Sequence, residues 1–469
     1  MHDLVFRMKM PRIHDASASE ILQFQQSLLK WYDQNHRSLP WRDIAAKEAD
    51  SNKKAYAVWV SEIMLQQTQV ATVVEYFNKW IKKWPTVEAL ATADLDEVLK
   101  VWSGLGYYSR ARRLHEGAQK VCTDLEGRVP DSAEALLRLP GVGRYTAGAV
   151  ASIAFGQRTP VVDGNVVRVL ARVRAVGAAS DSKPVTDWLW KTAGQLVDPD
   201  RPGDFNQALM ELGATVCTPR EPACRTCPVR PQCAAYRLTG QRNGPVKSTS
   251  AVSAPVADIE ECGSPCPLCL PTDLWETERG VLNFPRKPRK AAPRAEQVAT
   301  CVLHRDRRRF LLCQRPESGL LASLWEFPSV QLSEEEPSDS AVDSALRRLL
   351  SGPLAPPAGP LQPVGDITHI FSHIRRVYRA RSAPLSRETE EPPVPEGYQT
   401  ARWVSREDLL QAGIPTPVRK ILKLFEAEPT PKRAPARTTQ KSDGKRQASL
   451  TSFFGPATRR RRTEEAEQN

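Results

Sequence analysis

The sequence lacks any run of about eighteen apolar residues, the length that a helix needs to cross a membrane. Its first residues, MHDLVFRMKMPRIHD, have neither the length nor the apolar stretch of a secretory signal. Ten cysteines without such a signal argue for metal binding rather than for disulfides. We therefore expect a chain that makes no membrane contact and uses its cysteines as ligands.

What the chain does have is length and positive charge. Its 469 residues are enough for two or three domains, and 66 Lys and Arg against 54 Asp and Glu leave a net charge of +12. This balance favours a polyanionic partner. Shifts in composition and periodicity predict an N-terminal segment (1–19), a helical domain (20–237), a connector (238–293), a strand-rich domain (294–427) and a disordered basic tail (428–469).

The stretch 139–169, LPGVGRYTAGAVASIAFGQRTPVVDGNVVRV, joins a hairpin to an acid. We expect LPGVG to turn between helices at 132–138 and 144–155, with Gly141 and Gly143 freeing the backbone so that amides point at one anion. Asp163 then opens another helix. Each feature alone is ordinary, since glycine turns are common and Asp is a frequent N-cap.

A second acid, Glu62, lies in SEIMLQQTQV among the apolar residues Val60, Ile63, Met64 and Val70. A charge there costs several kcal/mol unless it is paired or protonated. We therefore expect a raised pKa, which suits a general acid working near neutrality. On an unremarkable helix, a solvated Glu is the ordinary reading.

LPGVGRYTA followed by VVDGNV resembles the helix-hairpin-helix DNA glycosylases, and SEIMLQQTQV is similar to the motif of the MutY family of adenine DNA glycosylases. The resemblance implies an all-α glycosylase domain that removes adenine opposite 8-oxoguanine, and also opposite guanine, by base flipping. In that family Glu62 is the acid that protonates adenine N7 and Asp163 stabilises the sugar cation or attacks it. Tyr145 and Asn165 position these groups and the water.

Tyr145 separates this reading from its nearest alternative. Bifunctional relatives, such as endonuclease III, carry Lys at this position of the hairpin, and Tyr forms no Schiff base. We therefore expect a monofunctional glycosylase rather than a glycosylase and lyase. A catalytically silent lesion-binding scaffold is the third reading, against which the pairing of Glu62 with Asp163 argues.

Several residues are candidates for contact with DNA. Trp41 and Arg42, after a proline turn, are equally compatible with the core and with the wall of a base pocket. By the resemblance, Gln67 and Thr68 wedge into the duplex, and Tyr107 on its Gly-bounded loop intercalates at some cost in stacking. The full set of expected contacts is Trp41, Arg42, Gln67, Thr68, Leu105, Tyr107, Gly141 and Gly143.

Two groups of cysteines stand out. Six, two and five residues separate the members of the first group, Cys217, Cys224, Cys227 and Cys233. Four thiolates suit zinc or a four-iron cluster, and this spacing is that of the MutY and endonuclease III cluster, so we expect [4Fe-4S].

The second group, Cys262, Cys266 and Cys269, matches a zinc site that needs one more ligand, although three free thiols are the alternative. This group resembles the zinc linchpin of mammalian MutY homologues, in which an N-terminal His is the fourth ligand. His14 is at the corresponding place in this sequence. The short spacing before Cys266 makes Cys262 the weakest member of the set.

From Arg294 the pattern resembles a Nudix fold, an α+β domain, with GLLASLWEFPS preceding the expected box. The segment SDSAVDSALRRLLSG lacks the acids that would hold magnesium, so we expect recognition rather than hydrolysis. In MutY proteins a Phe-Ser-His loop of this domain reads 8-oxoguanine, and HIFSHIRRVY supplies Phe371, Ser372 and His373. Local caps are the alternative for the last two.

The tail contains QASLTSFF, in which Gln447, Leu450, Phe453 and Phe454 have the arrangement of a peptide that docks on the replication sliding clamp, PCNA. The arginine run 459–462 suggests nuclear localisation or contact with DNA. The resemblance adds mismatch-repair, checkpoint-clamp and abasic-endonuclease proteins as candidate partners. It also implies that the protein is a monomer. A mitochondrial form is compatible with the family.

Overall fold

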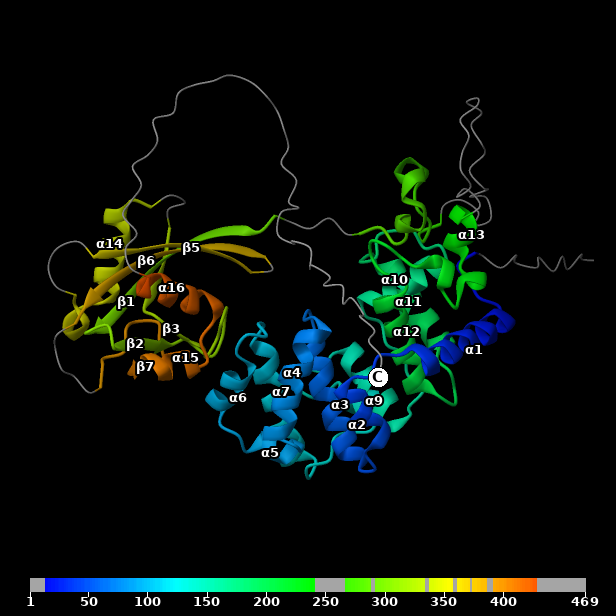
Figure 1. Cartoon of the computed structure of the whole chain (residues 1–469), viewed down its shortest axis with the longest axis horizontal. Coiled ribbons are helices and arrows are strands. Elements are labelled where there is room, and N and C mark those ends of the chain that lie inside the picture. Colours follow the sequence, from blue (N-terminus) through cyan, green and yellow to red (C-terminus); the bar gives the residue numbers. More distant parts are fainter. Residues whose placement is uncertain are drawn as a thin grey trace, which may run out of the picture. The chain divides into compact units, whose positions relative to one another are not determined.

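The computed structural model describes residues 13–240, 266–287, 292–333, 337–356, 361–371, 373–385 and 391–427 (Figure 1). Ser372, Cys262 and the clamp motif Gln447 to Phe454 lie outside these residues. No helix in the described residues is long and apolar enough to span a membrane. A helical region comes first, a short connecting segment follows, and a region built on a sheet comes last.

The helical region is built from α-helices with short loops between them. They are α1 (Ala18–Asn35), α2 (Pro40–Lys47), α3 (Ser51–Leu65), α4 (Val70–Lys83), α5 (Val87–Ala91), α6 (Leu95–Trp102), α7 (Ser109–Asp124), α8 (Ala133–Leu136), α9 (Arg144–Phe155), α10 (Gly164–Val173), α11 (Lys183–Leu196), α12 (Pro202–Thr215) and α13 (Ala234–Gly240). Two 3-10 turns, η1 (Cys224–Thr226) and η2 (Arg230–Gln232), precede α13.

Two apolar cores hold these helices together. One gathers α2 to α9 around buried tryptophans such as Trp59 and Trp80, and the other gathers α1 and α10 to α12 around Phe24 and Phe205. Helix α9 belongs to both, since Ala147 and Val150 face the first core while Ala149 faces the second. The start of α9 therefore lies where the two cores meet.

Local sequence explains how α2 and α3 begin, and the structure corrects two expectations, the proline turn before Trp41 and the length of the helix at 132–138. The proline turn expected before Trp41 is the first turn of α2, because Pro40 at N1 is preset for a helix and needs no amide partner there. The polar stretch 43–54 is mostly helical, since the Asp50 carboxylate caps α3 by accepting from Asn52 and Lys53. Helix α8 is shorter than the expected 132–138.

The last region is a mixed sheet of seven strands. They are β1 (Arg294–Arg305), β2 (Arg309–Gln314), β3 (Trp325–Glu326), β4 (Ser329–Leu332), β5 (Gln362–Ile370), β6 (Ile374–Pro384) and β7 (Thr400–Ser405). The main order is β3-β2-β1-β6-β5, with β4 beside β1 and β7 beside β2. Only the β1 and β6 pairing is parallel among the described strands, with Val298 opposite Tyr378.

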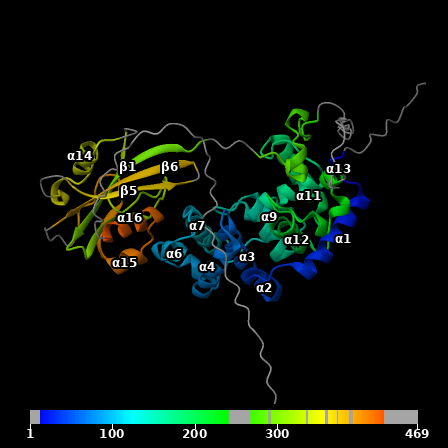
Figure 2. The same ribbon diagram turned by 45° about the horizontal axis from the view of Figure 1, so that its top comes forward.

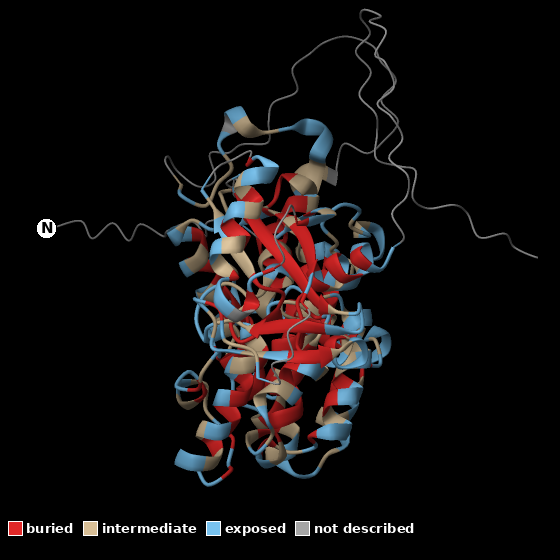
Figure 3. Cartoon of the chain, turned by 90° about the vertical axis from the view of Figure 1, so that its left-hand side faces the viewer, coloured by how far each residue is buried: buried red, intermediate tan, exposed pale blue. Residues whose placement is uncertain are grey.

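Helices cover both faces of this sheet (Figure 2). Alternate residues of β1 supply the two cores: Val298 and Val302 pack with α15 (Arg406–Gln411) and α16 (Thr416–Glu426), whereas Ala299 and Leu303 pack with α14 (Asp339–Leu349). Figure 3 shows the strands buried between their helices. The turn η6 (Gly352–Leu354) follows α14. The expected fold class, a helical domain followed by an α+β domain, is therefore confirmed.

The connecting segment 266–287 packs on the helical region. The Leu268 carbonyl accepts from the amides of Gly177 and Ala178, and Phe284 joins a small core with Ala175 and Ala234. Its 3-10 turns are η4 (Thr272–Leu274) and η5 (Thr277–Asn283).

Candidate active site

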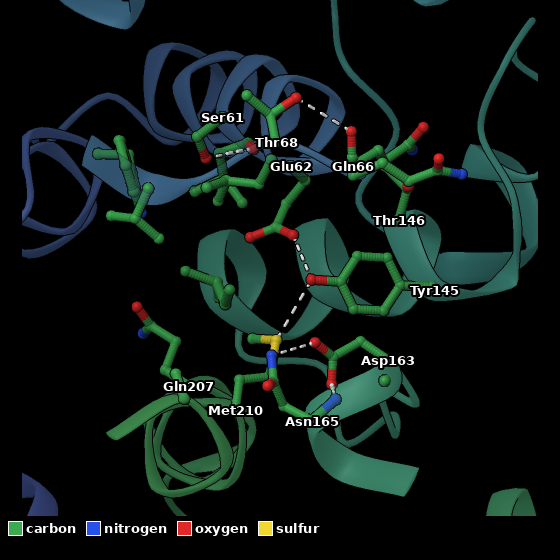
Figure 4. Close-up of a pocket in the computed structure, with 18 of the residues that line it drawn as sticks. Ser61, Glu62, Gln66, Thr68, Tyr145, Thr146, Asp163, Asn165, Gln207 and Met210 are labelled. Atoms are coloured by element: carbon green, nitrogen blue, oxygen red, sulfur yellow. Dashed lines mark hydrogen bonds between the residues drawn. The ribbon is translucent and has the colours of Figure 1, made fainter. Parts of the chain in front are cut away.

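A cavity of about 930 Å³ lies at the start of α9, where the two helical cores meet. Its walls come from α2, α3, the glycine hairpin, α9, α10 and α12 (Figure 4). Of the residues expected from the sequence, those in this wall are Trp41, Arg42, Glu62, Gln67, Thr68, Gly141, Gly143, Tyr145, Asp163 and Asn165. The fold thus brings into one cavity residues that are up to 124 positions apart in sequence, from Trp41 to Asn165.

Glu62 is the buried acid of this cavity. It is 5% exposed on α3, and the Tyr145 hydroxyl donates a hydrogen bond to its Oε2 while lying 3.2 Å from the Met210 sulfur (Figure 4). Burial raises the pKa of Glu62 to about 7, with the nearby Asp163 charge adding to this, although the Tyr145 bond and Arg42 pull the other way. The carboxyl is therefore poised to gain or lose a proton near neutrality.

Asp163 is both an N-cap and part of the cavity wall. Its Oδ1 accepts from the amides of Asn165 at 2.9 Å and Val166 at 2.7 Å, and its Oδ2 accepts from the Asn165 side chain at 2.8 Å. Burial raises the pKa of Asp163, while these hydrogen bonds oppose the rise. Three donors thus fix the carboxylate in one orientation.

Arg168 extends this arrangement toward the first cysteine group. Its Nη2 donates to Asn165 Oδ1 at 2.8 Å and to the Gly213 carbonyl at 2.6 Å, and its Nε donates to the Cys217 carbonyl at 2.7 Å. The cavity and the cysteine loop therefore share one guanidinium.

Glu211 on α12 is a residue of the wall that the sequence did not reveal. It is 1% exposed, and its carboxylate accepts from Arg37 Nε at 2.7 Å and from Arg42 Nη2 at 2.9 Å. Burial opposes its ionisation, but the two arginines outweigh burial and lower the pKa of Glu211 to about 2. Glu211 lies in the helical stretch ALMEL, and nothing in this stretch predicts that its partner is Arg37, 174 positions away in the sequence.

The hairpin corrects part of the glycine argument. Gly141 has φ +75°, and a Cβ there would lie 2.7 Å from the Arg113 Cβ, so a side chain is excluded. Gly143 is the N-cap of α9 in an extended conformation (φ −94°), with open space around the position of a Cβ. The conformational freedom of glycine is therefore needed at Gly141 alone.

The residues expected to contact DNA differ in their exposure. Gln67 and Tyr107 have left-handed backbones, with φ 55° and 47°, and the Tyr107 side chain is 46% exposed. Leu105 is 6% exposed and packs into the helical core, and Trp41, also 6% exposed, meets Phe77 edge to face at 5.5 Å between ring centroids. Burial leaves Leu105 little surface for contact with DNA.

One hollow beside α10 is lined by all four cysteines of the first group, Cys217, Cys224, Cys227 and Cys233. Arg172 lies beside it, with Nη1 3.4 Å from the Cys217 sulfur. The four cysteines of the first group, which are spread over the segment after α12, are therefore gathered at one place in the fold.

A second donor group is tighter. His14, Cys266 and Cys269 have donor atoms within 4.8 Å of one another, and the His14 ring is 2% exposed. His14 Nδ1 lies 2.8 Å from the Arg174 carbonyl, which leaves Nε2 directed at the Cys269 sulfur, 3.3 Å away. This is the arrangement of a histidine oriented for a single metal ion.

Phe371 and His373 flank the turn between β5 and β6. The Phe371 ring meets His369 edge to face at 4.5 Å between centroids, and the His373 carbonyl accepts from the Arg294 amide at 2.9 Å. The Arg376 guanidinium lies 5.8 Å from the centre of the Phe371 ring and is paired with the buried Glu296.

Comparison with known proteins matches both regions. Residues 60–195 match the HhH-GPD superfamily of base excision DNA repair proteins, and residues 299–424 match the NUDIX domain. A thermostable thymine-DNA glycosylase is a solved structure similar to this chain, with 31% identity, 48% of this chain and 99% of that one covered, and a TM-score of 0.42.

Relatives extend the match over most of the sequence. The adenine DNA glycosylase of Rattus norvegicus is 51% identical over 87% of this chain and 79% of its own length. The Homo sapiens enzyme is 51% identical over 87% of this chain and 75% of its own length, and that of Schizosaccharomyces pombe is 35% identical over 86% and 89%. With identity this high across both regions, the chain belongs to the adenine DNA glycosylase family, the MutY homologues of base excision repair.

Proposed function

We propose that this enzyme hydrolyses the N-glycosidic bond of adenine mispaired with 8-oxoguanine, or with guanine, and leaves an abasic site in DNA. The observation that carries this proposal is the buried Glu62, with a pKa of about 7, in the same cavity as the oriented carboxylate of Asp163. One acid able to donate a proton and one carboxylate able to face a cation are what acid-catalysed glycosidic cleavage requires.

The adenine must leave the stack to enter the cavity, at a cost of a few kcal/mol that a mispair reduces. Glu62 then protonates N7 and turns the base into a leaving group. Asp163, held by Asn165, stabilises the oxocarbenium-like sugar electrostatically or bonds to it transiently. Water completes hydrolysis, with Glu62 returning as the base.

Tyr145 supports a glycosylase without lyase activity. Its hydroxyl is engaged with Glu62, and burial raises the pKa of Tyr145 well above its usual value. A neutral phenol offers no amine for attack on the sugar, so strand cleavage does not follow base removal.

We propose that Cys217, Cys224, Cys227 and Cys233 hold a [4Fe-4S] cluster. The six, two and five spacing of these cysteines in the sequence and their position around one hollow support this cofactor. The cluster would brace the loop that Arg168 joins to Asn165, and Arg220, Arg225 and Arg230 on that loop would contact phosphates.

We further propose one zinc ion on His14, Cys266 and Cys269, with Cys262 as the fourth ligand. Such an ion would tie the connecting segment to the residues before α1, because His14 and the two cysteines come from these two stretches.

We assign recognition of 8-oxoguanine to Phe371, Ser372 and His373 on the strength of the family motif, and of these Phe371 and His373 lie between β5 and β6. PCNA binding through Gln447, Leu450, Phe453 and Phe454, and a nuclear location, are proposed on sequence alone. A crystal structure of the C-terminal domain of mouse MUTYH with human PCNA is among the solved structures similar to this chain, at 35% identity, with a TM-score of 0.23 and 28% of this chain covered.

The proposal is tested by single-turnover reaction with a duplex that carries adenine opposite 8-oxoguanine, with and without alkali. We expect strand breaks only after alkali. Breaks without alkali would instead favour the bifunctional alternative, and no release of adenine in either arm would favour the scaffold. Glu62→Gln should abolish release, and a Glu62→Gln variant with unchanged turnover would contradict the mechanism.

A further inference from the structure

Arg110, in the first turn of α7, places its guanidinium between the loop after α3, which lines the cavity, and the loop that precedes α7. Its Nη1 donates to three carbonyls near the end of α3: Ile63 at 2.8 Å, Met64 at 3.1 Å and Gln66 at 2.5 Å. The last carbonyls of a helix have no partner within it, and a cation there also suits the helix dipole. Arg110 therefore caps the helix that carries the catalytic acid, directly after Glu62.

The other nitrogen of the same guanidinium serves the second loop. Arg110 Nη2 donates to the Gly106 carbonyl at 3.1 Å, and lies 3.3 Å from Thr68 Oγ1. The guanidinium carbon is 5.5 Å from the Tyr107 ring centre and 5.2 Å from that of Trp102, whose indole also donates to the Gly106 carbonyl at 3.0 Å. One side chain thus reaches both loops that carry the wedge residues.

The contacts fall at two strained points of the backbone. Gln67 and Tyr107 both have positive φ, 55° and 47°, a backbone conformation that residues other than Gly, Asn and Asp rarely adopt. In each case Arg110 binds the carbonyl of the preceding residue, Gln66 or Gly106, and so fixes the peptide plane that leads into the strained residue. Strained conformations persist where the surrounding structure determines them.

We propose that Arg110 is a positioning residue that holds Gln67 and Tyr107 as a pair of wedges and couples them to the helix bearing Glu62. Opening of the duplex and presentation of the acid then occur in one fixed geometry. This inference rests on the proposed glycosylase function and on the wedge role that the family resemblance implies for Gln67, Thr68 and Tyr107.

Lysine distinguishes this role from that of a simple helix cap. Its ammonium is a single point charge, whereas the planar guanidinium directs separate nitrogens to separate loops. Arg110→Lys keeps a cation near the end of α3 but loses the bridge to Gly106. If Arg110 serves only the helix, lysine will retain the function.

The experiment uses the full chain and single-turnover excision of adenine opposite 8-oxoguanine. The variants are Arg110→Lys, Gln67→Ala, Tyr107→Ala and the double variant of Arg110→Lys with Gln67→Ala. The matched control is Lys120→Ala, which removes a cation from the same helix, where its amine donates to the Arg138 carbonyl. A second duplex carries mismatches on both sides of the adenine, which lower the cost of unstacking.

We expect Arg110→Lys to slow excision about tenfold on the paired duplex, as for loss of buried hydrogen bonds, and to recover most of that loss on the mismatched duplex. The double variant should be no slower than the slower single variant, since both changes impair one step. Lys120→Ala should match the wild type on both duplexes, with equal melting temperature and iron content.

Wild-type rates for Arg110→Lys on the paired duplex would overturn the inference. So would an equal loss on both duplexes with multiplicative effects in the double variant, because general damage to the fold gives that pattern. If Gln67→Ala and Tyr107→Ala both react at the wild-type rate, the wedge role itself fails. These two variants test that role independently of any change at Arg110. Should Arg110→Lys not fold, Trp102→Phe, which removes the other donor to Gly106, must show the same selective recovery.

Discussion

The phenol of Tyr145, a half-buried residue, donates a hydrogen bond to the carboxylate of the buried Glu62. This bond stabilises the ionised form of Glu62 and so restrains the rise in pKa that burial causes. Tyr145 therefore sets how acidic the general acid is, besides occupying the position at which a lyase would carry its amine.

Tyr145→Phe should move the pH dependence of excision upward. Loss of the hydrogen bond leaves burial less opposed, so the pKa of Glu62 rises further above about 7. Because a general acid works in its protonated form, the alkaline fall in the single-turnover rate should shift to higher pH. The rate should be measured from pH 5 to 9, and a fall at unchanged or lower pH would contradict the role of this bond. Thr146→Ser, a neighbouring change in the same helix, is the control.

Glu62→Gln should stabilise the protein at alkaline pH. The folded-state pKa is raised from 4.5 to about 7, so the folded state binds more protons than the unfolded state across this interval, and stability falls as pH rises through it. Above pH 7 the ionised carboxylate costs the folded state about 3 kcal/mol, because its pKa is about 7 in the folded chain and 4.5 in the unfolded chain. The melting temperature of Glu62→Gln should exceed that of the wild type at pH 8, with a much smaller gain at pH 4.5. Equal gains at both pH values would show that ionisation is not the cause.

Patterns that lie within a few residues of each other could be read from the sequence. The apolar stripe around Glu62 correctly predicts that this residue is buried, and Asp163 is the N-cap that its position before a helix suggests. The two readings of Asp163, cap and site residue, are compatible because its backbone-bound carboxylate also faces the cavity.

Features that depend on distant partners could not be read in the same way. Arg168 meets the Cys217 carbonyl 49 positions away, and Arg110 meets Ile63 47 positions away. In the sequence, both look like ordinary arginines of amphipathic helices, because only the fold brings the carbonyls that they bind close to them. Pro40 illustrates the local limit, because a proline fits a turn and the first turn of a helix equally well.

Gly141→Ala and Gly143→Ala form a matched pair for the hairpin. Alanine at Gly141 would adopt φ +75° and place its Cβ 2.7 Å from the Arg113 Cβ, so we expect a loss of stability of about 1–3 kcal/mol and weaker DNA binding. Alanine at Gly143 fits an extended backbone and open space, so its stability should change little. Melting temperature and binding to an uncleaved duplex would be compared for both. Equal losses would show that the conformation of Gly141 is not what the hairpin requires.

The two donor groups should lose their metals independently. Cys233→Ser removes one of the four thiols of the first group, so we expect loss of iron and sulfide, with looser packing of the loop that Arg168 ties to Asn165 and slower excision as a result. Cys266→Ser removes a member of the tight group at His14, so zinc should be lost while iron and sulfide stay at four per chain. Both metals would be quantified by elemental analysis of the purified full chain. Cys122→Ser, at a half-buried cysteine outside both groups, is the control and should retain both metals. Zinc found in the first group, or iron lost from Cys266→Ser, would contradict the assignment, because the two groups share no residue and each is assigned its own metal.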